Sequence, residues 1–269
     1  GMTNRSFIFT VNNKRYIMRI PGEGTDKLID RKEEYDVYQR VKKEPYTETI
    51  LYLNPDSGYK ISEFLENTRN SDANNIQDVK KSMSVLRKFH NQNYQVDHTF
   101  DLWKQIDFYE SLRKIASAYR DYEEIKDWVL KLKPFIEDNV TKWSLCHIDA
   151  NYDNFLIDQN NNVFLIDWEY AGMQDPDLDI AMYAIYAGYT KEKIDQLINI
   201  YYENKVSENI RYKIYAYVAV GGLLWSNWCE YKQSLGLDFG EYSLAQYRYA
   251  KEYSKLVLNY LEKKNDRNK

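Results

Sequence analysis

The sequence changes in character partway along the chain, from strand-like alternation to helical spacing. Residues 7–20 show the two-residue alternation of strands on both sides of Asn12-Asn13, which is typical of a β-hairpin. A second hairpin is predicted for residues 49–65. Beyond the polar stretch 66–75, apolar residues recur three and four positions apart, as on one face of a helix. This order indicates an α+β protein whose strands gather toward the N-terminus.

The predicted elements divide the chain into two parts. The helices expected along the chain span residues 26–41, 79–90, 101–118, 122–138 and most of the chain beyond 177. Short strands are expected at 155–158 and 163–167, around a turn. We therefore predict a small β-rich N-lobe over residues 1–66 and a larger, mostly helical C-lobe over residues 67–269.

Composition excludes several classes of protein. A net charge of −4 argues against nucleic acid as the main partner. The two cysteines are too few for a disulfide framework and fit a reducing compartment. No signal peptide is recognisable, and the longest apolar run, Ile214 to Trp225, is shorter than the roughly 20 residues of a membrane span. These features predict a cytoplasmic protein that does not insert into membranes.

One segment, residues 145–172, carries the pattern of a reaction centre. Asn154 directly precedes the predicted strand pair, whose second strand ends at Asp167. Because a hairpin brings its ends together, we expect an amide and a carboxylate to converge there, as oxygen ligands suited to Mg²⁺. Asp149 can face the same point and orient a hydroxyl while the metal holds a phosphate. His147-x-Asp-x4-Asn followed by strand and Asp is the kinase pairing of catalytic loop and metal ligand.

Two aromatic stripes indicate what the acceptor could be. Trp225 and Trp228 are three positions apart on a predicted helix, and so are Tyr183, Tyr186 and Tyr189 on another. Such stripes are usually packing residues, but together they could wall a cage for a quaternary ammonium, which is held by ring quadrupoles. Acidic residues that could attract a cation over a longer range are Asp175, Asp177 and Glu230.

The motif region resembles the bacterial choline kinase family, within the choline/ethanolamine and aminoglycoside phosphotransferase group. The sequences HIDANYDNFLID and FLIDWEYAGMQDPDLDIA carry this resemblance, which extends over nearly the whole chain. GMTNRSFIFTVNNKRYIMRIPG resembles the family's nucleotide-loop hairpin, and IDRKEEYDVY its first helix. ISEFLEN resembles the segment that joins the lobes, and GGLLWSNWCEY the choline-site helix. The resemblance implies a two-lobed protein-kinase-like fold and phosphotransfer from ATP, with Mg²⁺, to choline.

The resemblance also implies a role for individual residues. Asp149 would be the catalytic base, and Asn154 and Asp167 the Mg²⁺ ligands. Arg19 would contact phosphate, anchored from the helix by Glu34, with its neighbour Glu33 as the alternative. Residues expected at the nucleotide are Thr3, Asn4 and Arg5 under the phosphates, and Glu63, Phe64 and Leu65 beside adenine.

Further residues are expected on the substrate side and in supporting roles. The residues expected to line the substrate site are Trp225, Trp228, Tyr183, Tyr186, Tyr189 and Glu169. Glu169 is left open between supporting the metal and scaffolding. His147 is expected to bond the backbone near Asp167, and Asp179 to brace the catalytic loop.

The start of the chain departs from the family pattern. Family members carry a further strand and another glycine before GMTNR, so the glycine-rich loop is expected to be incomplete here. Gly1 before Met2 resembles a tag remnant, which makes Met2 the expected native start. The alternatives are a start assigned too late, a lost first strand, or a piece of a larger protein.

Four functions remain open from the sequence. The first is a choline kinase that makes phosphocholine. The second is a kinase for ethanolamine, an aminoglycoside or another small alcohol. The third is a pseudokinase or choline-binding module without turnover. A metal-dependent hydrolase is disfavoured, because His90 and His98 do not lie in a metal-binding pattern. The sequence does not indicate an oligomeric state.

Overall fold

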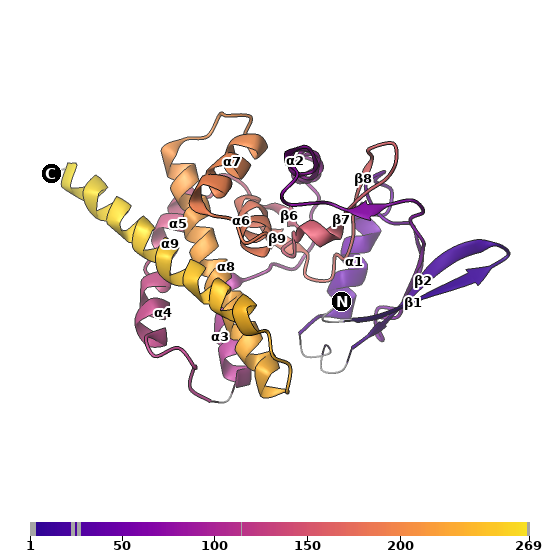
Figure 1. Cartoon of the computed structure of the whole chain (residues 1–269), viewed down its shortest axis with the longest axis horizontal. Coiled ribbons are helices and arrows are strands. Elements are labelled where there is room, and N and C mark those ends of the chain that lie inside the picture. Colours follow the sequence, from indigo (N-terminus) through magenta and orange to yellow (C-terminus); the bar gives the residue numbers. More distant parts are fainter. Residues whose placement is uncertain (1–3, 23–24, 26–27, 114, 268–269) are drawn as a thin grey trace. The chain divides into compact units, whose positions relative to one another are not determined.

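The computed structural model describes residues 4–22, 25, 28–113 and 115–267 of the chain. The chain forms two compact units (Figure 1). The first lies within residues 1–99 and 144–173, and the second within residues 100–143 and 174–269. This division follows a different line from the lobes predicted at residues 1–66 and 67–269, which stay a prediction. The segment with the reaction-centre pattern belongs to the first unit.

The first unit contains a four-stranded antiparallel sheet with the strand order β1-β2-β4-β3. Its strands are β1 (Asn4–Val11), β2 (Lys14–Pro21), β3 (Ile50–Leu53) and β4 (Lys60–Glu63). Both predicted hairpins are therefore confirmed. Asn12 and Asn13 have φ of 48° and 60°, the left-handed conformation that a tight two-residue turn requires and that asparagine tolerates.

Helix α1 (Arg31–Val41) begins later than predicted. The Asp30 carboxylate accepts hydrogen bonds from the backbone N–H groups of Lys32 and Glu33 and so caps the helix at that point. Residues 28–30 are not helical, so the predicted start at residue 26 is wrong; residues 26 and 27 lie outside the described part.

Short strands place the reaction-centre segment in the first unit. β7 (Phe155–Ile157) and β8 (Val163–Leu165) form the predicted hairpin, and β5 (Arg69–Asn70) extends it on the β7 side. β6 (Ser144–Cys146) pairs with β9 (Gly172–Gln174). The sequence did not predict β5, β6 or β9, because strands of two or three residues are too short to show alternation. Helix α2 (Ile76–His90) has the apolar face expected of it.

The second unit is helical. Its elements are α3 (Leu102–Arg113), α4 (Tyr122–Leu130), α5 (Lys133–Asn139), α6 (Asp177–Tyr186), α7 (Lys191–Tyr201), α8 (Glu208–Ser234) and α9 (Gly240–Arg267). The single helix predicted over 122–138 is two helices, because Pro134 lacks an N–H and begins a new one. The helix predicted over 101–118 is shorter at its C-terminal end. None of the described helices is long and apolar enough to cross a membrane.

The two long helices α8 and α9 pack against each other (Figure 1). At Gly222 the backbones approach so closely that an added Cβ would lie 2.5 Å from the Gln246 carbonyl oxygen and 2.8 Å from the Ala250 nitrogen. At the adjacent Gly221 the nearest atoms are the ends of flexible side chains, at 3.0 Å and 3.2 Å. The packing of α8 on α9 therefore requires glycine at position 222, whereas position 221 has room for a small side chain.

We expect Gly222→Ala to destabilise the protein and Gly221→Ala to be close to neutral. Alanine gains about 1 kcal/mol of helix propensity over glycine at either position, but at Gly222 overpacking against backbone costs about 1–3 kcal/mol or more. Urea unfolding of the two variants measures the difference. Equal stabilities would show that α9 can shift away from α8 at no cost.

Candidate active site

The loop before β7 holds the predicted base and one predicted metal ligand together. The Asn154 side-chain amide donates to the Asp149 backbone carbonyl at 2.9 Å and to the Asp149 carboxylate at 3.1 Å. Asn154 O in turn accepts a hydrogen bond from Ile166 N, one residue before Asp167, at 3.0 Å. Asp149, Asn154 and Asp167 are thus tied to one another, directly or through the neighbouring backbone. The closeness of the hairpin ends, expected from the sequence, is present.

The backbone is left-handed on both sides of this loop. Ile148 has φ of 66°, in a region that β-branched residues avoid, and Asp167 has φ of 67°, which aspartate tolerates more readily. The conformation of Ile148 costs roughly 1–3 kcal/mol and is of a kind found where surrounding packing holds a functional group in place. The Ile148 side chain is fully buried, so packing on that side chain can hold the turn that presents Asp149.

His147 connects the loop to the strand end. One of its ring nitrogens, Nε2, lies 2.9 Å from the Ile166 carbonyl oxygen, which is the backbone contact predicted for it. Its ring also packs against Trp168, with centroids 4.8 Å apart, and both side chains are fully buried. This environment fits a positioning residue, and the supporting role of His147 stays a proposal.

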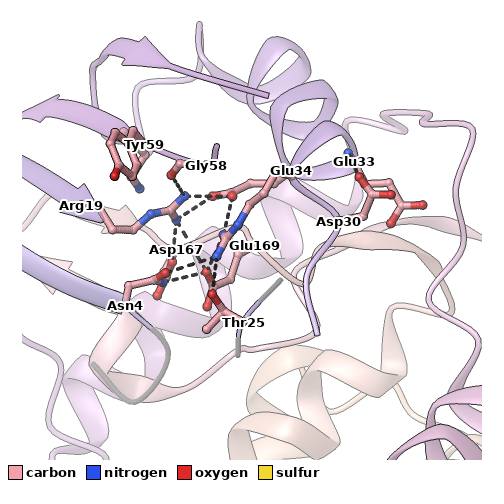
Figure 2. Close-up of polar contacts among 12 residues, drawn as sticks. Asn4, Arg19, Thr25, Asp30, Glu33, Glu34, Gly58, Tyr59, Asp167 and Glu169 are labelled. Atoms are coloured by element: carbon pink, nitrogen blue, oxygen red, sulfur yellow. Dashed lines mark hydrogen bonds and ion pairs between the residues drawn. The ribbon is translucent and has the colours of Figure 1, made fainter. Parts of the chain in front are cut away.

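The sheet and α1 contribute a buried ion pair, which Figure 2 shows beside Asp167. Arg19 of β2 makes a two-pronged contact with Glu34 of α1: Nη1 lies 2.6 Å from Oε1, and Nη2 lies 2.8 Å from Oε2. Arg19 Nη2 also donates to the Gly58 carbonyl at 3.2 Å. Glu33 points away from this cluster, beside Asp30 (Figure 2). Of the two glutamates considered from the sequence, Glu34 is therefore the one that pairs with Arg19.

A second arginine, which sequence reasoning missed, completes the cluster. Arg31 Nη1 lies 2.9 Å from the Glu34 carboxylate and 3.2 Å from the Glu169 carboxylate. Its Nη2 lies 3.4 Å from Asn4 Oδ1 and 3.3 Å from Thr25 Oγ1. Arg31 stands three residues before Glu34 on a helix, the spacing at which opposite charges meet, and that was the available signal.

Charge and burial shift the pKa values of this cluster. Burial would raise the pKa of Glu34, but the Arg19 guanidinium outweighs it and holds that pKa below its ordinary value. Burial, followed by repulsion from the Asp167 carboxylate, raises the pKa of Glu169 to about 7, despite attraction to Arg19 and a hydrogen bond from Asn4. The carboxylates near Asp167 therefore carry more negative charge than the site readily accommodates.

The predicted metal ligands fit a magnesium ion on the chemistry of their oxygen atoms. Asp167 Oδ1 is buried and forms an ion pair with Arg19 at 3.5 Å, but has no hydrogen-bond partner among the described residues. The Asn154 amide nitrogen is turned toward Asp149, which leaves the amide oxygen as the group that can bind a cation. Both are hard oxygen donors, and the excess of carboxylates around them suits a divalent cation.

The residues expected at the nucleotide occupy several environments. Thr3 lies outside the described residues. Arg5 is exposed on β1, whereas the Asn4 side chain is buried and engaged with Glu169 and Arg31. Glu63 ends β4, Phe64 N donates to Arg15 O at 3.1 Å, and Leu65 O accepts from the Thr68 hydroxyl. The nucleotide-binding roles of all these residues stay predictions.

The aromatic residues separate into two groups in the second unit. Trp225 and Trp228 lie nearly perpendicular with ring centroids 6.1 Å apart, and the Tyr186 ring is 5.8 Å from that of Trp225. Tyr183 and Tyr189 contact each other, with centroids 6.2 Å apart. Trp228 also carries a cation, because Lys232 Nζ lies 5.5 Å from its ring centroid. The structure thus joins Tyr186 with the tryptophan pair.

The acidic residues proposed to attract a cation are already in buried ion pairs. Lys213 Nζ lies 2.5 Å from the Asp175 carboxylate and 3.0 Å from that of Asp177. Glu230 accepts hydrogen bonds from Arg113, Ser117 and the Ala118 N–H. Their charges are therefore largely compensated within the second unit. Asp179 is buried in α6 of the second unit, and its predicted contact with the catalytic loop stays a prediction.

The chain is similar in sequence and in structure to known choline kinases. The sequence profile described as choline/ethanolamine kinase matches residues 1–220. The protein LicA of Haemophilus influenzae is 27% identical, over 91% of this chain and 75% of its own length. The crystal structure of the choline kinase LicA from Streptococcus pneumoniae superposes with a TM-score of 0.84, at 29% identity, covering 95% of this chain and 91% of that one.

A structure of LicA in complex with AMP is similar to the same degree. Its TM-score is 0.83 at 28% identity, and the match covers 96% of this chain and 90% of that one. The predicted fold is confirmed: the chain has the protein-kinase-like α+β fold, with a small β-sheet N-terminal part and a helical C-terminal part.

The Glu169 environment predicts a pH dependence of stability for the metal-free protein. The folded state holds the Glu169 proton up to about pH 7, whereas the ordinary pKa is 4.5, so the contribution of Glu169 to stability is greatest below pH 4.5 and falls as the pH rises toward 7. Between about pH 5 and about pH 8, in the presence of a chelator, we expect the free energy of unfolding of the unaltered protein to fall by on the order of 2 kcal/mol through Glu169. Glu169→Gln should not show this decrease.

Chemical unfolding across this pH range provides the measurement. Glu137→Gln, at an exposed position on α5, is the matched control and should follow the unaltered protein. If the free energy of unfolding of Glu169→Gln showed the same pH dependence as that of the unaltered protein, Glu169 would not be the group that takes up the proton.

Proposed function

We propose that this chain, which belongs to the choline/ethanolamine kinase family, transfers the γ-phosphoryl group of ATP to the hydroxyl of choline. The family's members are nucleotide-dependent phosphotransferases that act on an alcohol. The products would be ADP and phosphocholine. We place the reaction in the cytoplasm, where ATP is supplied.

One observation carries the proposal. Asn154 is fixed by its amide nitrogen on Asp149, and its backbone carbonyl is bonded to the residue before Asp167. A choline-binding module without turnover has no need of a base and two oxygen ligands tied together in this way. This arrangement favours an enzyme over the pseudokinase alternative.

Each residue would have a defined task. Asp149 would accept a hydrogen bond from the hydroxyl of the acceptor and so orient the hydroxyl oxygen toward the phosphorus. Asn154 and Asp167 would hold Mg²⁺, which neutralises charge between the phosphates when bound. Arg19 would contact phosphate from its fixed position on Glu34. Catalysis would then consist of positioning and electrostatics, with no covalent enzyme intermediate.

The acceptor would be a cation held by aromatic faces. A quaternary ammonium offers no N–H donor, so ring quadrupoles are its natural partners, and Trp225 with Tyr186 presents two adjacent rings. Lys232 Nζ already lies over one face of Trp228, which favours the ring of Trp225 as the partner of choline. Ethanolamine, with a primary ammonium, would favour hydrogen-bond acceptors over rings and is the second candidate.

A coupled assay of ADP release over choline, ethanolamine, further amino alcohols and aminoglycosides tests the proposal directly. Choline is expected to give the highest kcat/KM, and turnover should require Mg²⁺. A higher kcat/KM for ethanolamine or for an aminoglycoside would reassign the acceptor. Absence of ADP release with all of them, from a folded protein that binds choline, would favour the binding module.

Asp149→Ala should lower kcat about 10²–10⁴-fold, because the acceptor hydroxyl loses its general base. Steady-state kinetics with saturating ATP and choline measures this. Asp153→Ala is the matched control: its carboxylate is exposed on the same loop and accepts a hydrogen bond from the Asn70 side-chain amide. Near-normal turnover of folded Asp149→Ala protein would remove Asp149 from the role of base.

Trp225→Ala should raise the KM for choline much more than the KM for ATP. A desolvated cation–π contact is worth about 2 kcal/mol, which corresponds to roughly 30-fold in affinity. Trp143→Ala, at a tryptophan that is 49% exposed, should change neither KM. Equal changes in the two KM values for Trp225→Ala would assign Trp225 to the core.

A further inference from the structure

The cluster beside Asp167 contains three carboxylates and two guanidinium groups. The carboxylates belong to Glu34, Asp167 and Glu169, and the guanidiniums to Arg19 and Arg31. Except for Asp167, which is 33% exposed at its side chain, all of these side chains are at most 8% exposed. In such surroundings an uncompensated charge is costly, so the way in which the carboxylates are shared between the arginines matters.

The distances between these groups show which arginine pairs with which carboxylate. Glu169 Oε2 lies 3.2 Å from Arg31 Nη1 but 3.7 Å from Arg19 Nη1. Arg31 therefore takes Glu169, with help from the Asn4 amide at 2.7 Å. Arg19 keeps its two-pronged contact with Glu34, and Asp167 stays outside the hydrogen-bonding range of Arg19, at 3.5 Å.

The backbone around Arg31 is built to hold it there. A Cβ at Gly58 would lie 2.6 Å from both Cδ and Nε of Arg31, and Gly58 has φ of 70°. The Arg31 guanidinium then contacts Asn4 on β1, Thr25, Glu34 on α1 and Glu169 after β8. Three parts of the chain, around residues 4, 25–34 and 169, thus meet at one side chain. Among the residues that the structure describes, removing Arg31 would leave Arg19, at 3.7 Å, as the cation paired with Glu169.

We propose that Arg31 is a positioning residue for the nucleotide site. By holding Glu169 and sharing Glu34, it prevents Glu169 from drawing Arg19 away from the phosphates and leaves the Asp167 oxygen oriented toward the metal. This inference rests on the proposed Mg²⁺–ATP site. It goes beyond that site because Arg31 itself need not touch nucleotide, metal or acceptor.

The test is a double-mutant cycle between Arg31 and Glu169, read by displacement of a fluorescent ADP analogue by ADP in the presence of Mg²⁺. Arg31→Met should weaken Mg²⁺–ADP binding roughly tenfold. In the Glu169→Gln background no carboxylate at this position needs a cation, so the same change should weaken Mg²⁺–ADP binding less than about threefold. Arg31→Lys keeps the charge without the fork and should lie between.

Arg40→Met is the matched control on the same helix. Arg40 is exposed near the end of α1 and pairs with Asp36, so its loss should leave ADP affinity unchanged. Circular dichroism establishes that each variant is folded. If Arg31→Met does not fold, the cycle is run with Arg31→Lys.

Two results would overturn the proposal. One is an unchanged ADP affinity for Arg31→Met, and the other is an equal loss in both backgrounds, which marks a generally structural arginine. If the unaltered protein binds no nucleotide, the proposed function fails. The cycle is then read in thermal unfolding of the metal-free protein at about pH 8, where no coupling between the two positions would overturn the inference separately.

Discussion

The contact between Arg19 and Glu34 is the constraint on which the candidate site depends. A guanidinium and a carboxylate placed in a nearly dry environment must meet in good geometry, or the cost of removing them from water exceeds their attraction. Here both oxygens of Glu34 contact Arg19, which fixes the strand β2 and the helix α1 relative to each other. Because the pair lies beside Asp167, the same contact aligns the sheet with the predicted metal ligand.

The hairpin of β7 and β8 supplies the second half of the arrangement. Its ends carry Asn154 and Asp167, and the bond between Ile166 N and Asn154 O closes it where the two side chains emerge. Left-handed backbone at Ile148, a β-branched residue, shows that the chain is bent against its preference at this point. Packing in the first unit must compensate for that cost, and the buried ring contacts of Trp168 with His147 and Phe89 are part of it.

Regular patterns in the sequence predicted the larger elements and the central site motif. Two-residue alternation revealed both hairpins, and the spacing from His147 to Asp167 revealed the loop and its strands. What escaped were features decided by distant parts of the chain: strands of two or three residues, which exist because a partner strand is near, and Arg31, which resembles any surface charge on a helix. The split at Pro134 was readable from the sequence, since proline cannot continue a helix.

The first unit is made from two separated stretches of chain, and this has a consequence for how the protein acquires its structure. The hydrogen bond from Asn4 to Glu169 closes a loop of 165 residues. During synthesis from the N-terminus, Arg19, Glu34 and Arg31 emerge long before Glu169 and Asp167. The loop-closure entropy must be overcome before Glu169 and Asp167 reach the cluster, so we expect their contacts to form later in folding than the local pairs of Glu34 with Arg19 and Arg31. Until residue 169 has emerged, water must solvate the charged groups that the finished protein buries.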